Sequence, residues 1–487
     1  MHKVKTIVFL VVLAALALPV FQLRYSIFSE WLLKGYELPS APPELKYFTW
    51  QRWFSQDFQQ VFITRLNEHT GFRNTLIRIR NQYDYTFFGI THAEGFLEGK
   101  DRYFFEEDYI HEYTGKYFIG TKAIDKKLSR LKNVMDSLAS YNIPLILVFE
   151  SGKGSFYPEY IPDRFHAEKR TKSNYDYFVE RSTEIGLPFL DINHYFLGMK
   201  DTSKYPLFPK YGMHWSLFGV RLVADTLSKL IAGATGRTMP NFRVHHLHQS
   251  DKSLGFDYDI GEMLNLIFPL KPTPGAYPIV SMGSIPNGKL SALVVADSYY
   301  IMLVESYGKK MFGKQDFWYY NSSVYPHQNE IPPVKVDKTG LREQLKQHDV
   351  ILLMVSETNL HCGFWGFADE AYSAFHPEIK DSQLEGIENS IRIDREWFRF
   401  MVRKSEEQKK PLDEVIRSDA EYAFLSNYQN LEGKGYQDTI QFFKLNLSYN
   451  PEWVARMTKR ALQLNIPVDS VMVREAVDSY NQSKKKQ

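Results

Sequence analysis

Apolar residues follow two alternating arrangements through the middle of this chain. In the first, they stand next to one another, which is typical of strands buried on both faces of a parallel sheet. Such runs occupy residues 144–149, 292–296 and 350–355, and a shorter strand is expected at 189–191. In the second, they recur every three or four positions, as on one face of a helix. This spacing covers residues 122–141, 172–185 and 215–231. Strands that alternate with helices predict a doubly wound, mostly parallel α/β sheet over residues 95–375.

The N-terminus combines a basic start with a long apolar run. Lys3 and Lys5 precede a run over residues 7–21 that only Pro19 interrupts. This arrangement is typical of a secretory signal or a membrane anchor. Positive residues on the inner side would place the bulk of the chain outside the cytoplasm. Because apolar residues continue beyond the run, we favour an uncleaved anchor over residues 1–24, with a cleaved signal as the alternative.

The segments on either side of the predicted sheet differ from it and from each other. Residues 25–94 are expected to form a linker, rich in proline at 39–43, and then a helical lead-in. Residues 376–487 are expected to form a helical domain with an internal repeat, because a set of residues recurs 56 positions later. Each copy predicts a helix, a proline-marked turn and a second helix. We interpret the repeat as structural packing, and a docking surface for a partner protein is the alternative.

Charge and cysteine content exclude some classes of protein. The 59 basic and 57 acidic residues nearly balance, giving a formal net charge of +2, so nothing indicates nucleic-acid binding. Cys362 is the single cysteine, so no internal disulfide can form. An exported protein without disulfides fits a Gram-negative periplasm better than a disulfide-rich secreted scaffold. The isolated pair of His361 and Cys362 favours a buried or incidental thiol over a metal ligand or nucleophile. No metal site or cofactor is expected.

The most informative position for chemistry is Ser298. It follows the apolar run 292–296 and Asp297, where open α/β sheets place ligands, at the carboxyl end of a strand. A serine there becomes a nucleophile if a base reaches it. The alternative is that Asp297 and Ser298 only cap the helix that follows.

His214 is the best base for Ser298. It lies in a Met-His-Trp turn just before the helical stretch 215–231, as a loop-borne base would. A neutral imidazole that titrates near pH 7 suits general-base catalysis. A structural histidine is the alternative for this residue taken alone.

Several stretches, taken in order, resemble the AlgJ/AlgX-type alginate O-acetyltransferase family. This family is a circularly permuted, SGNH-hydrolase-like group with DHHW-type relatives. The resemblance covers about residues 45–360, with the histidine motif before the serine motif. The matching stretches are Gly99-Lys100-Asp101-Arg102-Tyr103-Phe104-Phe105, the loop 150–159, His214-Trp215-Ser216-Leu217-Phe218-Gly219, the segment 257–266, and Ala296-Asp297-Ser298-Tyr299.

The resemblance implies a fold, an activity and partners. The fold would be SGNH-hydrolase-like, with Ser298 as the acyl-carrying nucleophile, His214 as the base, and the Ser298 N–H in an oxyanion hole. The protein would move acetyl groups onto hydroxyls of an exopolysaccharide at the periplasmic face of the inner membrane. A membrane-bound O-acyltransferase would be its partner. Lys153, Tyr157 and Asn321 are expected to support the site.

The sequence departs from the family's base motif at one position. The family has an aspartate two residues before the histidine, and this chain has Gly212 there. Loss of the orienting carboxylate costs about 10⁴ in rate in a serine protease. A backbone carbonyl, or a carboxylate such as Glu357, could orient His214 instead, whereas Asp297 is expected to cap its helix. Otherwise the chain would be a catalytically impaired adaptor, and a carbohydrate esterase is a further alternative.

Overall fold

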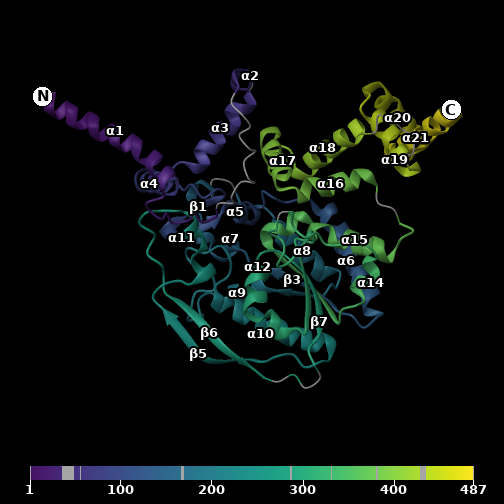
Figure 1. The fold of residues 1–487 in the computed structure, drawn as a ribbon. Helices are drawn as coiled ribbons and strands as arrows, with labels where there is room; N and C mark the ends of the chain where they lie inside the picture. The colour runs from purple at the N-terminus through teal and green to yellow at the C-terminus, as the bar shows by residue number, and fades with distance from the viewer. Residues whose placement is uncertain are drawn as a thin grey trace.

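The computed structural model describes residues 2–35, 49–54, 56–165, 169–283, 285, 288–330, 332–379, 382–427 and 435–485. The proline-rich stretch at 39–43 lies outside the described residues. An α/β body occupies the middle of the chain, with helices before and after it (Figure 1).

A six-stranded sheet forms the centre of the body. Its order is β4-β3-β10-β7-β8-β9, and all neighbours pair in parallel except β8 with β9. The strands are β3 (Leu145–Glu150), β4 (Phe189–Asp191), β7 (Ser291–Ala296), β8 (Lys314–Tyr319), β9 (Ser323–Val324) and β10 (Val350–Ser356). This confirms the predicted fold class, an SGNH-hydrolase-like α/β fold with a mostly parallel sheet.

Helices cover both faces of this sheet. Because successive side chains of a strand point to opposite faces, Leu145, Leu147 and Phe149 of β3 join one core, and Ile146 and Val148 join the other. The first core includes residues of α6, α8, α14 and α15, and the second includes residues of α9, α10 and α12. The helices of the body are α5 (Glu107–Thr114), α6 (Thr121–Ala139), α7 (Lys153–Phe156), α8 (Asn174–Glu184), α9 (Ile192–Met199), α10 (Leu217–Thr235), α11 (Asp259–Met263), α12 (Tyr299–Leu303), α13 (Lys309–Met311), α14 (Leu341–Leu345) and α15 (Phe367–Phe375).

Two antiparallel ribbons were not predicted. One pairs β1 (Phe96–Glu98) with β2 (Phe104–Glu106), and the longer one pairs β5 (Phe242–Ser250) with β6 (Gly275–Met282). The chain between β5 and β6 includes α11, which lies on the same side of the body as β1 in Figure 1. The two strands of the longer ribbon therefore flank a segment, including α11, that lies against the body.

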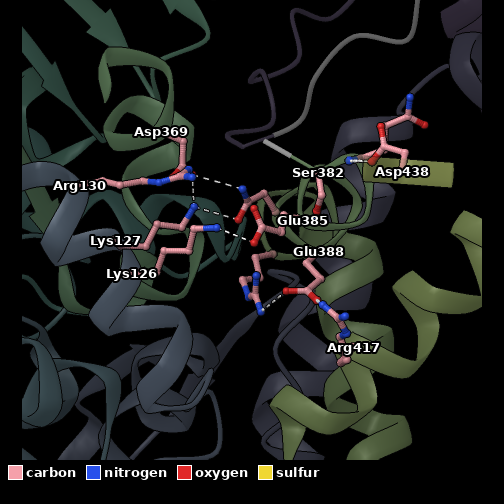
Figure 2. Close-up of polar contacts among 12 residues, drawn as sticks. Lys126, Lys127, Arg130, Asp369, Ser382, Glu385, Glu388, Arg417 and Asp438 are labelled. Atoms are coloured by element: carbon pink, nitrogen blue, oxygen red, sulfur yellow. Dashed lines mark hydrogen bonds and ion pairs between the residues drawn. The ribbon is translucent and has the colours of Figure 1, made fainter. Parts of the chain in front are cut away.

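The C-terminal helices dock on the body through both apolar and charged residues, and Leu384, Ile391 and Phe398 join the first core. These helices are α16 (Gln383–Ile393), α17 (Arg395–Gln408), α18 (Leu412–Asn427), α19 (Tyr436–Ser448), α20 (Pro451–Leu464) and α21 (Val468–Lys485). Figure 2 shows Lys126, Lys127 and Arg130 of α6 meeting Asp369 of α15 and Glu385 of α16. In both repeat copies the methionine is buried, so packing accounts for the repeated apolar positions.

The N-terminal helices project from the body. Helix α1 (His2–Tyr25) extends away from it, with α4 (Arg73–Phe88) at its base (Figure 1). The other two are α2 (Trp50–Phe54) and α3 (Gln56–His69). Among the described residues, 3–25 form the one helix long and apolar enough to cross a membrane. An N-terminal apolar helix of this kind is consistent with the expected anchor.

Candidate active site

Ser298 lies at the carboxyl edge of the sheet. Strand β7 ends at Ala296, and α12 begins directly after Ser298, so the hydroxyl stands between strand and helix. Ser298 is half-buried, while the residues on both sides of it are buried. The neighbours of β7 are β10 and β8, and the three parallel strands end at this edge. The predicted strand-to-serine break is therefore present.

The carboxylate of Asp297 stabilises the turn after β7 rather than orienting His214. One of its carboxylate oxygens accepts the Tyr299 N–H at 3.1 Å, which agrees with the expected cap at the start of α12. The other accepts the Ser356 N–H and the Asn359 amide, each at 2.9 Å. Asp297 is fully buried, and these three bonds tie the turn after β7 to the end of β10.

His214 reaches Ser298 from the loop before α10. The distance from His214 Nε2 to Ser298 Oγ is 2.9 Å. Ser216 begins α10 by accepting the Gly219 N–H at 3.0 Å, which fixes the loop that carries the histidine. The His214 ring contacts the edge of Tyr299, with a centroid distance of 4.7 Å. His214 is buried, with 6% of its surface exposed.

Asp259 is the carboxylate beside the other ring nitrogen. Its Oδ2 lies 3.6 Å from His214 Nδ1, somewhat beyond hydrogen-bond distance. Its Oδ1 accepts the backbone N–H groups of Met213, at 3.0 Å, and Ile260, at 2.7 Å. Nδ1 is buried and has no hydrogen-bond partner among the described residues. A shift of about half an ångström would close a Ser298–His214–Asp259 triad, and catalytic hydrogen bonds are often longer before substrate binds.

Gly212 has no room for the aspartate that the family places there. A Cβ at this position would lie 2.5 Å from Pro209 Cγ and 2.6 Å from the Phe256 carbonyl oxygen. The segment 256–259 therefore occupies the space of a side chain at 212 and brings Asp259 to the histidine. The carboxylate beside His214 Nδ1 thus comes from a residue that follows His214 in the chain.

Lys153 supports the base loop, which is the segment before α10 that carries His214. Its Nζ donates hydrogen bonds to the carbonyl oxygens of Gly212, at 2.8 Å, and Lys210, at 3.1 Å. Burial lowers the pKa of Lys153 to about 7, and the charge of Asp259 acts in the opposite direction. A neutral amine keeps two N–H donors, so both bonds persist in either protonation state. Lys153 is thus a support for the loop that carries His214.

The other residues expected at the site have partners other than Ser298 and His214. They are Glu357, Tyr157 and Asn321. Glu357 accepts hydrogen bonds from Ser155, at 2.7 Å, and from the Gly152 N–H, at 3.1 Å. Burial raises the pKa of Glu357 to about 8, while these two hydrogen bonds oppose the rise. The carboxylate beside His214 Nδ1 is thus Asp259, and Glu357 supports the turn after β3.

Tyr157 and Asn321 belong to separate clusters. The Tyr157 ring packs against Tyr103, with a centroid distance of 5.0 Å, within a group of tyrosines. Asn321 donates to the Trp365 carbonyl at 3.0 Å and accepts from Lys338 at 2.7 Å. These contacts give both residues structural partners.

Besides Asp259, two groups near the site were not identified from the sequence. Burial raises the pKa of Tyr320 well above its ordinary value, and a hydrogen bond with Ser298 acts in the opposite direction. Burial and Asp108 raise the pKa of Glu106, which the charges of Arg395 and His214 oppose. Arg395 donates to Glu106 at 2.6 Å, so the C-terminal helices reach the neighbourhood of the base. The only sequence signal for Tyr320 is its place in an aromatic run, Phe317-Trp318-Tyr319-Tyr320.

Residues 96–253 match the family model described as SGNH hydrolase-like domain, acetyltransferase AlgX. The match confirms the resemblance expected from the sequence over that segment. It includes Lys153 and His214 and ends before Asp259 and Ser298. No curated protein matches the chain significantly.

Solved structures with low sequence identity also align with the chain. The O-acetyltransferase domain of Pseudomonas putida AlgJ is 15% identical, with a TM-score of 0.35, over 55% of this chain and 92% of that one. Pseudomonas aeruginosa AlgX is 16% identical, with a TM-score of 0.33, over 57% of this chain and 65% of that one. Bacillus cereus PatB1 with a sulfonyl adduct is 10% identical, with a TM-score of 0.37, over 54% and 97%. At these values the likenesses add nothing about activity.

Proposed function

We propose that this chain is an envelope O-acetyltransferase that moves acetyl groups onto hydroxyls of an exopolysaccharide through Ser298 and His214. The observation that carries the proposal is the 2.9 Å distance between His214 Nε2 and Ser298 Oγ, with Asp259 beside Nδ1. The match of residues 96–253 to an acetyltransferase family supports the same reaction class.

The first half of the reaction loads the serine. Ser298 Oγ attacks the carbonyl carbon of an acetyl donor while His214 Nε2 accepts the hydroxyl proton. The carboxylate of Asp259 orients the imidazole and stabilises its charged form. The Ser298 N–H and the Tyr320 hydroxyl are the proposed donors to the oxyanion. When the intermediate collapses, the imidazolium returns the proton to the leaving group, and acetyl-Ser298 remains.

The second half passes the acetyl group to the acceptor. A sugar hydroxyl gives its proton to His214 Nε2 and attacks the acyl carbon. Collapse of the second intermediate breaks the bond to Ser298 Oγ, which takes the proton back. With water as acceptor the same residues would give an esterase, so the acceptor alone separates these two reactions.

The proposed location is the periplasmic face of the inner membrane, with α1 as an uncleaved anchor. The apolar α1 and the basic residues before it support this placement. A membrane-bound O-acyltransferase that delivers acetyl groups is the proposed partner. The adaptor alternative rested on Gly212, and the position of Asp259 beside His214 favours the enzyme over it.

Replacing Ser298 with alanine in the native organism tests the proposal. Ester-linked acetate on the purified exopolysaccharide should fall to background while the protein level stays normal. Ser322→Ala is the matched control, because Ser322 is exposed and its hydroxyl bonds only to the nearby Tyr319 carbonyl at 3.3 Å. Unchanged acetylation in Ser298→Ala would contradict catalysis by this chain.

A further inference from the structure

Helix α4 is attached to the body through polar side chains. Arg78 donates to the carbonyl oxygens of Leu32, at 2.9 Å, and Leu266, at 3.3 Å. Asn81 is buried and donates to the Leu264 carbonyl at 3.0 Å. These bonds fix which face of α4 points inward, and that face is rich in polar groups.

The opposite face of α4 is apolar and exposed. Leu76, Ile79, Tyr83 and Phe87 follow one another at spacings of three or four residues, so they share one side of the helix. Their exposed fractions are 48%, 48%, 55% and 68%. A surface helix of a water-soluble protein has the reverse arrangement, with its apolar side against the core. We call these four residues the outer face of α4.

The outer face is continuous with the base of α1. A Cβ on Gly71 would lie 2.2 Å from the Pro19 carbonyl oxygen, so the end of α1 packs directly on the turn before α4. The ring of Phe72 contacts Phe28, with a centroid distance of 5.8 Å. If α1 crosses the membrane, α4 begins where α1 leaves it.

We propose that the outer face of α4 docks on the lipid surface of the outer leaflet. The proposal rests on the proposed placement of α1 in the membrane, which brings α4 to the lipid boundary. The composition of α4 fits an interfacial helix, because aromatic and aliphatic side chains share one side and Arg80, 73% exposed in its side chain, lies beside them. Such helices bury their apolar side about 5–10 Å into the boundary of headgroups and acyl chains.

Docking of α4 would fix the body relative to the membrane. One spanning helix leaves a body free to tilt, whereas a second contact next to its base restrains it. The active site would then be held at a constant height above the bilayer, which suits a transfer from a membrane-bound donor.

Spin labels on the full-length chain test the proposal. Ile79→Cys and Phe87→Cys report on the outer face, and Leu462→Cys on α20, which is 79% exposed, is the control. Val12→Cys reports separately on α1. The wild-type chain, whose Cys362 is buried, gives the blank. Each variant is reconstituted in vesicles of phosphatidylethanolamine and phosphatidylglycerol, and power saturation compares relaxation by oxygen with relaxation by a water-soluble nickel complex.

The labels at 79 and 87 should be relaxed severalfold more by oxygen than by nickel, while the label at 462 shows the opposite. Nickel access at 79 and 87 equal to that at 462 would overturn the proposal and leave the face to a protein partner. Spin–spin broadening at 79 and 87 would overturn it in favour of a second copy. A nickel-accessible label at 12 would overturn the proposal together with the proposed anchor. None of these results bears on the catalytic role proposed for Ser298.

Discussion

The two sides of the proposed active site are built in different ways. The nucleophile turn, Asp297–Ser298, joins a strand and a helix that follow one another in the chain, and the carboxylate of Asp297 bonds to the start of α12 and to the end of β10. The base loop before α10 depends on distant segments, because Lys153 holds its carbonyl groups and Asp259 holds its Met213 N–H. Ser298 thus lies between a strand and a helix that are consecutive in the chain, whereas the loop of His214 depends on two segments that are distant in sequence.

The difference teaches where this site tolerates change. In the proposed triad, Asp259 takes the place of the aspartate that the resembled family has two residues before the histidine, and Gly212 stands at that position. The nucleophile turn has no such freedom, since strand, turn and helix are consecutive. Three substitutions on the base side should therefore separate orientation, space and support, and a fourth, at Glu357, tests the turn after β3.

Asp259→Asn should have the largest effect of the four. Asparagine keeps an oxygen for the Met213 and Ile260 N–H groups but loses the charge that stabilises the imidazolium. We expect kcat/KM for hydrolysis or transfer of 4-nitrophenyl acetate to fall about 10²-fold or more. Glu262→Gln, on the same helix and paired with Lys34 on the surface, should retain activity. Equal activity of the two variants would remove Asp259 from the triad.

Gly212→Asp should damage the site rather than restore the family motif. The new side chain would meet the Phe256 carbonyl oxygen, so the loop must move. We expect a loss of about 1–3 kcal/mol in stability, together with lower activity. Gly233→Ala in α10, where a Cβ meets open space, should be neutral or stabilising by up to about 1 kcal/mol. Higher activity in Gly212→Asp would mean that the base side is incomplete as it stands.

Lys153→Met should weaken activity about tenfold, by analogy with other residues that support catalytic groups. It should also change the pH dependence of stability. The pKa of Lys153 falls from 10.5 to about 7 on folding because the ammonium group is buried. Between these pH values the unfolded chain holds the proton and the folded chain does not, so stability rises with pH. Thermal unfolding from pH 7 to 10 should lose this rise in Lys153→Met. Lys200→Met, which removes a surface ion pair with Glu159, should keep it.

Glu357→Gln should have the smallest effect, confined to stability. Burial raises the pKa of Glu357 from 4.5 to about 8, so between these values the folded chain holds a proton that the unfolded chain has lost. Stability therefore falls as pH rises through this range, and glutamine removes that fall while keeping the bonds from Ser155 and Gly152. Unfolding of the two proteins at pH 5 and pH 8 checks the sign, with Glu159→Gln as the exposed control. A large loss of activity would instead place Glu357 in the catalytic site.

The amino-acid sequence by itself predicted four of the six strands of the sheet, all but β8 and β9, and both residues of the proposed proton transfer. The buried runs that become β3, β7 and β10 are continuous and apolar, so local pattern was enough to predict them. Ser298 could be predicted because a strand, a turn and a helix are consecutive in the chain. His214 could be predicted from its turn and from the ordered motifs around it.

Tertiary structure alone decided which carboxylate lies beside His214 Nδ1 and which way α4 faces. Asp259 lies within a stretch whose sequence resembles the family. Its carboxylate comes close to His214 Nδ1 only because the segment between β5 and β6 packs against the body. The apolar side of α4 gave the ordinary signal of a core helix, and only the inward bonds of Arg78 and Asn81 show that it faces out. Periodicity fixes which residues share a face, whereas long-range polar contacts fix where that face points.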